Sequence, residues 1–163
     1  MKIRKLRVQD APLMLEWMHD HSVILYFREN FADKKLDDCV RFIISSQDET
    51  ENIHFAVADD ADEYMGTVSL KHIRQGTAEF GIALRDCGIG CGYAASALQE
   101  ILEYGYKNRG IDTVYLCVDP ENRRALRFYE KHGFQRCEVP DQASGYTDEE
   151  KRKYIWYQLK KHP

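Results

Sequence analysis

A glycine turn between a strand pattern and a helix pattern constrains this chain more than any other feature. Residues 79–84 read as a strand, and residues 93–107 repeat apolar side chains at helical spacing, with Gly90-Cys91-Gly92 between them. Residues 113–118 are almost entirely apolar, which is typical of a strand covered on both faces. Because a strand, a helix and a second strand follow in this order, the two strands are predicted to be a parallel pair.

The remaining patterns predict short strands and helices around this unit. The strand before the glycine turn is expected to begin at residue 77, and further strands are expected at residues 2–7, 53–57, 64–70 and 154–159. Helices are expected after Asp10, with Pro12 in the first turn, and at residues 37–45 and 123–132. Residues 140–151 read as a polar loop. The fold class is therefore α/β, with one parallel pair inside an otherwise antiparallel sheet.

Composition indicates one domain over residues 1–163. The chain is 44% hydrophobic and 31% charged and has no low-complexity run, so a real core is expected and disorder is not. No apolar run approaches the roughly 20 residues of a membrane span, and the N-terminus lacks a signal-peptide core, so a cytoplasmic protein is expected. The net charge of -4 gives no support for nucleic-acid binding. Acidic clusters at residues 59–63 and 148–150 favour a cationic substrate.

The cysteines do not indicate a disulfide framework or a metal site. There are five of them, an odd number, with no C-x-x-C spacing, so reduced thiols are expected. Cys87 and Cys91 have no further His or Cys nearby to complete a zinc site, so no metal is expected.

The glycine turn is also a candidate phosphate site. The first N–H groups of a helix have no partner within the helix, and the helix dipole is positive at that end. Glycine removes the side chains that would block a phosphate from approaching. The alternative is that these glycines serve the turn alone.

A resemblance to a known family strengthens the phosphate interpretation. Residues 79–98, the turn 118–122, and the segment Asn122–Phe134, which reads N-x-x-A-x-x-x-Y-x-K-x-G-F, resemble the GNAT superfamily of acyl-CoA-dependent N-acetyltransferases. The segment Leu15–Asp20 resembles the branch that acetylates protein N-termini, polyamines and amino sugars. The resemblance implies a mostly antiparallel sheet whose parallel pair splays to admit acetyl-CoA, with helices on both faces.

The resemblance also implies roles for individual residues. The backbone of Ile82, Ala83 and Leu84 would meet the pantetheine arm, and Gly90, Cys91, Gly92, Tyr93, Ala94 and Ala95 would wrap the pyrophosphate. Asn122 would face the pantetheine, although it also suits a helix N-cap. Tyr129 would protonate the leaving thiolate, although it also suits a core aromatic position.

Three positions depart from the family pattern. Ile89 stands where Gln or Arg usually opens the phosphate turn, and Cys91 stands where Lys or Arg is common. A second register, Arg85-x-x-Gly88-x-Gly90, restores the arginine but displaces the helix. Cys117 stands where some members carry a glutamate base.

The base is therefore expected elsewhere. Glu79, at the start of the strand beside the cofactor, is the first candidate, acting directly or through water, and Asp86 is the alternative. His54, His72 and His132 are expected to be surface or core residues.

These inferences predict an enzyme that moves an acetyl group from acetyl-CoA to a primary amine by direct attack in a ternary complex. A small amine, either a polyamine or an amino sugar, is favoured over a protein N-terminus. A catalytically silent acyl-CoA-binding sensor is the alternative from another class. The N-terminal helices and residues 140–151 are expected to form the acceptor side. A homodimer is compatible with the sequence, which does not fix the oligomeric state.

Overall fold

A seven-stranded sheet in the order β1-β2-β3-β4-β5-β7-β6 forms the centre of the computed structural model, which describes residues 1–163. Its strands are β1 (Lys2–Lys5), β2 (Ile53–Ala58), β3 (Tyr64–Arg74), β4 (Thr77–Leu84), β5 (Thr113–Val118), β6 (Gln135–Arg136) and β7 (Ile155–Lys160). The helices are α1 (Ala11–Met18), α2 (His21–Ile24), α3 (Leu36–Ser45), α4 (Tyr93–Asn108), α5 (Arg123–Lys131) and α6 (Asp148–Lys153), with 3-10 turns η1 (Val8–Asp10) and η2 (Asp86–Gly88). Strands β4 and β5 are parallel and all other neighbours are antiparallel. The predicted fold class is confirmed.

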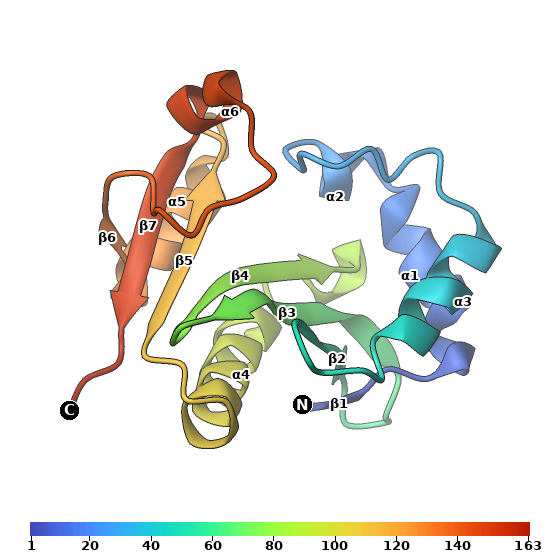
Figure 1. Cartoon of the computed structure of the whole chain (residues 1–163). Coiled ribbons are helices and arrows are strands. Elements are labelled where there is room, and N and C mark those ends of the chain that lie inside the picture. Colours follow the sequence, from blue (N-terminus) through green and yellow to red (C-terminus); the bar gives the residue numbers. More distant parts are fainter.

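The parallel pair separates along its length. Strands β4 and β5 share a ladder only where Thr77–Glu79 pair with Thr113–Tyr115. Beyond Glu79, β4 continues to Leu84 beside β3 alone, and Figure 1 shows β4 and β5 running apart. The backbone edge of β4 that faces β5 is therefore left without a partner strand, which opens the sheet at this point.

Two hydrophobic cores cover the two faces of the sheet. On one face, Phe55, Leu70 and Phe80 pack with α4 and with Tyr129 of α5. On the other face, α1 and α3 pack against Ala56 and Tyr64. Because successive side chains of a strand point to opposite faces, neighbouring residues of β2 belong to different cores.

Most element boundaries lie within two residues of the predicted ones, and the differences are local. The loop predicted at residues 140–151 is wrong at its end, because α6 begins at Asp148. Thr147 accepts a hydrogen bond from the Glu150 backbone N–H and Glu150 returns one, which is a capping box that the sequence already displays. Strand β3 extends to Arg74 rather than Leu70, and the short elements α2 and β6 were not predicted. None of the helices has the length and apolarity that crossing a membrane requires.

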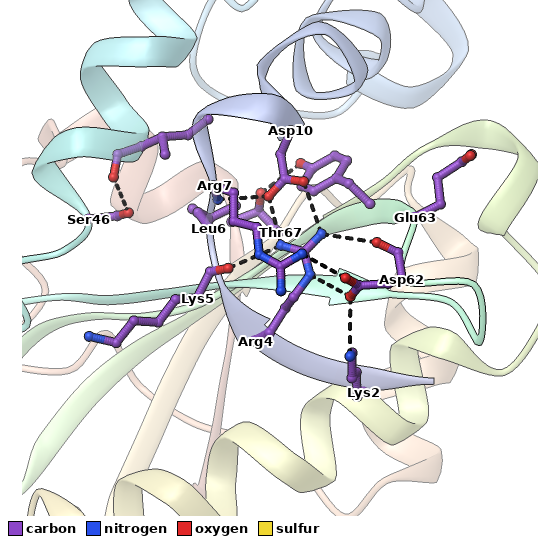
Figure 2. Close-up of polar contacts among 12 residues, drawn as sticks. Lys2, Arg4, Lys5, Leu6, Arg7, Asp10, Ser46, Asp62, Glu63 and Thr67 are labelled. Atoms are coloured by element: carbon purple, nitrogen blue, oxygen red, sulfur yellow. Dashed lines mark hydrogen bonds and ion pairs between the residues drawn. The ribbon is translucent and has the colours of Figure 1, made fainter.

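An ion-pair network fixes the N-terminal strand to the start of α1 (Figure 2). Arg4 binds Asp10 through two N–O contacts of 2.8 and 3.0 Å, and its Nε lies 2.9 Å from Asp62. Asp10 occupies the N-cap position of α1 as predicted, but its carboxylate makes no capping bond and accepts the backbone N–H of Arg7 instead. The network therefore ties β1, α1 and the turn between β2 and β3 together.

Candidate active site

A cavity of about 420 Å³ lies where β4 and β5 separate. The expected cofactor side is lined by residues from β4, β5 and α5 and the turn before α5, namely Glu79, Phe80, Gly81, Ile82, Ala83, Leu116, Cys117, Val118, Asp119, Asn122, Ala125 and Tyr129. The other side, which is the expected acceptor side, is lined by α1, by α3 and the segment before it, by β2 and β3, and by Tyr146 and Tyr154. The cavity therefore extends through the gap between β4 and β5, with its two sides joined at this point.

Tyr129 reaches the cavity from the core side of the sheet. Its ring packs edge-on against Phe80, Phe128 and Phe134 with centroid distances of 6.1, 5.2 and 5.3 Å, and the residue is 9% exposed. The hydroxyl has no hydrogen-bond partner in the protein. Burial raises the pKa of Tyr129 well above its usual value, so the phenol stays protonated at neutral pH and holds a proton to give.

Asn122 caps a helix and also lies in the cavity wall. Its side-chain oxygen accepts the Ala125 N–H at 3.2 Å and so caps α5. The residue also lines the cavity. Capping fixes the side chain at the position where the gap between β4 and β5 opens.

Glu79 is a buried carboxylate in the cavity wall. It is 5% exposed and is therefore not a solvated strand residue. Oε1 accepts a hydrogen bond from the Tyr146 hydroxyl at 2.6 Å and lies 3.8 Å from the Lys71 Nζ, while Oε2 lies 3.9 Å from His72 Nε2. Asp86, the alternative base, is exposed on η2 and does not line the cavity.

Tyr146 is the site residue that sequence reasoning missed most clearly. It lies in the loop before α6, and its hydroxyl also accepts a bond from the Cys117 thiol at 3.5 Å. Burial and the nearby Glu79 carboxylate raise the pKa of Tyr146, and burial raises the pKa of Cys117 to about 11. Cys117 is therefore a protonated thiol and not a thiolate nucleophile at neutral pH. Nothing local in the sequence marks this loop tyrosine.

The glycine turn lies at the start of α4, outside the cavity. Gly92 is the N-cap with φ +80°, Gly90 has φ +82°, and no side chain caps the helix. An added Cβ at either glycine would meet nothing within 4 Å, so the approach to the first-turn N–H groups is open. Of the residues assigned to the cofactor, Leu84 and Gly90 to Ala95 do not line the cavity, whereas Ile82, Ala83 and Asn122 do.

Arg85 argues against the second register of the phosphate turn. Its guanidinium is turned inward, with Nε 2.6 Å from Glu16 and Nη1 2.7 Å from Glu63. Because both carboxylates are already bound to it, Arg85 is a structural residue here. The register that starts at Gly90 places its glycines directly before α4 and is retained.

His54 and Arg28 complete the acceptor side. His54 Nδ1 lies 2.6 Å from Ser69 Oγ, and its ring packs edge-on against Phe42 at 4.7 Å. Arg28 binds Glu150 and the Gly145 carbonyl and lies over the Tyr146 ring, 4.3 Å from its centroid. Figure 1 shows the loop after α2 and the loop before α6 facing each other at this end of the molecule.

The burial of His54 predicts a pH dependence of stability. Burial, together with the positive charge of Lys71 and His72, lowers the pKa of His54 from 6.5 to about 4. The unfolded chain therefore binds this proton at a pH where the folded chain does not, and stability falls as the pH drops from about 6.5 to about 4. Between about pH 7 and about pH 5, wild type should lose about 1–2 kcal/mol more unfolding free energy than His54→Gln. Urea unfolding at both pH values measures this, and equal losses would contradict it.

The comparisons with known proteins identify the family. The acetyltransferase (GNAT) domain matches residues 1–135. Spermidine N(1)-acetyltransferase of Escherichia coli is 30% identical over 137 residues, covering 82% of this chain and 72% of that protein. The spermidine N-acetyltransferase of Vibrio cholerae, solved with CoA and spermine, superposes with a TM-score of 0.78 at 21% identity and covers 96% of this chain and 92% of that one. RimL, a ribosomal-protein α-N-acetyltransferase solved with CoA, superposes with a TM-score of 0.79 at 13% identity and covers 98% of this chain and 93% of that one.

This chain belongs to the GNAT family of N-acetyltransferases, as its sequence motifs predicted. The family match ends at residue 135, so it includes Glu79, the glycine turn, Asn122 and Tyr129. Tyr146 and the loop that carries it lie beyond the match.

Proposed function

We propose that residues 1–163 act as one domain that transfers acetyl from acetyl-CoA to the primary amine of a small molecule. The observation that carries the proposal is the cavity at the gap between β4 and β5, whose wall includes both a protonated Tyr129 and the buried carboxylate of Glu79. The pantetheine arm lies along the open edge of β4 at Ile82, Ala83 and Leu84, beside Asn122. The pyrophosphate meets the N–H groups from Gly90 to Ala95, including Cys91, Gly92, Tyr93 and Ala94.

In this proposal the amine attacks the thioester directly. Glu79 accepts the proton that the amine loses, and Tyr129 gives a proton to the sulfur as the thiolate leaves. Tyr146 donates to Oε1 of Glu79, which leaves Oε2 for the acceptor side. The protonated Cys117 supports direct transfer, because it is poorly suited to form an acetyl-enzyme.

The phosphate turn is tested by Gly92→Val beside Gly110→Val. Both glycines have positive φ, +80° and +61°, and neither has an atom within 4 Å of an added Cβ, but they lie at opposite ends of α4. The strain should therefore cost both variants a similar amount, about 1–2 kcal/mol. Acetyl-CoA should raise the Tm of wild type and of Gly110→Val, and should not raise that of Gly92→Val, where a branched side chain meets the pyrophosphate. An equal Tm increase in all three proteins would refute the assignment.

The base is tested by the pH profile of Glu79→Gln. If Glu79 takes the amine proton, the acidic limb of kcat/KM should flatten or move, because the amide cannot accept a proton. Asp86→Asn is the control, since Asp86 is outside the cavity and its profile should match wild type. If Glu79→Gln kept the wild-type pH profile, Glu79 would not be the base. Solvent would then take the amine proton, or Asp86 would take it if the pH profile of Asp86→Asn changed instead.

A further inference from the structure

The carboxylates on the acceptor side each have a cation of the chain as a neighbour. Glu29 lies 3.3 Å from Lys34, Glu79 lies 3.8 Å from Lys71, Asp119 lies 3.8 Å from Lys153, and Asp38 and Glu150 are bound by Arg41 and Arg28. In the acidic turn at residues 59–63, Asp60, Asp62 and Glu63 likewise form ion pairs, with the N-terminal amine, Lys2, Arg4, Arg7 and Arg85. An acceptor with several ammonium groups would find no unpaired carboxylate in this cavity.

The wall formed by the N-terminal segment contains a cluster of aromatic side chains. Trp17, Phe27 and Phe31 pack edge-on against one another with centroid distances between 5.0 and 6.0 Å, and all three line the cavity. Aromatic faces suit the C–H surface of a ring or a short chain and offer it no hydrogen bond.

The opposite wall, formed by the sheet, is polar, and beside the charged pair of Lys71 and Glu79 it carries the neutral side chains of His54 and Ser69. His54 on β2 pairs with Ser69 on β3, and Ser69 pairs with Gly81 on β4, so all three share one face of the sheet. Strands are about 4.8 Å apart, so His54 lies about 10 Å from the strand that borders the thioester. Because Gly81 has no side chain, the sheet surface between the cofactor side and the His54–Ser69 pair is not blocked at this position.

The His54–Ser69 pair can both give and accept a hydrogen bond. The imidazole is neutral at physiological pH, so one ring nitrogen is a donor and the other an acceptor. Nδ1 contacts Ser69, and Nε2 has no hydrogen-bond partner in the protein. A neutral donor–acceptor pair matches a hydroxyl group better than an ammonium group.

These observations point to the class of acceptor. Building on the proposed function, we propose that the acceptor is an amino sugar, a ring with one primary amine and several hydroxyl groups, and that the His54–Ser69 pair binds hydroxyls at the end of the cavity away from the thioester. The ring carbons lie against the aromatic wall of Trp17, Phe27 and Phe31, and the single amine lies toward Glu79.

The test is calorimetric titration of the CoA-bound protein with three kinds of amine. Amino sugars with the amine at C2, C3, C4 or C6 supply hydroxyls, cyclohexylamine supplies the ring without them, and spermidine supplies several ammonium groups. At least one amino sugar should bind more tightly than cyclohexylamine and spermidine by about tenfold or more. His54→Leu should lower the affinity for that amino sugar by about tenfold and leave the affinity for cyclohexylamine unchanged. The control His21→Leu, on the exposed helix α2, should change neither affinity. Ser69→Ala repeats the test with a smaller change to the wall.

Three results of these titrations would overturn the proposal. Spermidine or cyclohexylamine as the tightest ligand, no binding by any amino sugar, or wild-type amino-sugar affinity in both His54→Leu and Ser69→Ala would each refute it. Turnover is scored separately from binding. Spermidine acetylation ahead of every amino sugar refutes the acceptor class and retains the transferase, whereas amino-sugar binding without CoA release retains the site and refutes the transferase.

Discussion

Tyr129→Phe is expected to lower kcat for acetyl transfer by about 10²–10⁴-fold, which is the usual rate enhancement from a general acid. The hydroxyl that is lost makes no hydrogen bond within the protein, and the ring contacts to Phe80, Phe128 and Phe134 remain possible for phenylalanine. Because the proton is given only as the sulfur leaves, KM for acetyl-CoA should change by about twofold or less. Steady-state kinetics with a turned-over amine measure both constants.

The matched control is Tyr106→Phe on α4. Burial raises the pKa of Tyr106 as it does that of Tyr129, but Tyr106 does not line the cavity. Its kcat should therefore equal that of wild type. If Tyr129→Phe also kept the wild-type kcat, Tyr129 would be a core residue only.

Arg4→Met is expected to lower the free energy of unfolding by about 3 kcal/mol or more, because it leaves the buried Asp10 carboxylate without its cation. The side chains of Arg4 and Asp10 are 10% and 7% exposed, so water can hydrate the Asp10 carboxylate only poorly once Arg4 is removed. Methionine retains the length of the apolar stem, which separates the loss of charge from the loss of packing. Urea unfolding at neutral pH measures the change.

Arg7→Met is the control for this prediction. Arg7 also binds Asp62, at 2.6 Å, but its side chain is 51% exposed. Exposed ion pairs contribute about 0–1 kcal/mol, so this variant should be close to wild type. Equal losses in the two variants would show that the bidentate pair of Figure 2 contributes no more than a surface contact.

The secondary structure of the proposed cofactor side could be predicted from the sequence because local chemistry determines it. The bounds of β5, the N-cap glycine of α4 and the Asn122 cap of α5 each depend on a few consecutive residues. Glu79 was placed on the correct strand, but its burial could not be predicted, because Tyr146, 67 residues away in sequence, covers it.

The segments of the acceptor side were expected from the sequence, but the contacts between them could not be predicted because they join residues far apart in the chain. Arg28 meets Glu150 across 122 residues, and the His54–Ser69 pair depends on the register of β2 against β3. Periodicity indicates that a strand exists, but not which residue of the next strand lies opposite. The acidic clusters suggested a cationic substrate, whereas in the structure Asp60, Asp62, Glu63 and Glu150 of these clusters form ion pairs with arginines, lysines and the N-terminus.

The most direct test is to incubate the wild-type protein with acetyl-CoA and a panel of amino sugars, polyamines and N-terminal peptides, and to measure free CoA and N-acetylated product by mass spectrometry. We expect amine-dependent CoA release, with one N-acetylated small amine formed for each CoA and no acetyl group retained on the protein. Acetyl-CoA that binds and raises the Tm but is not consumed with any amine would contradict this and would identify the chain as a silent acyl-CoA sensor.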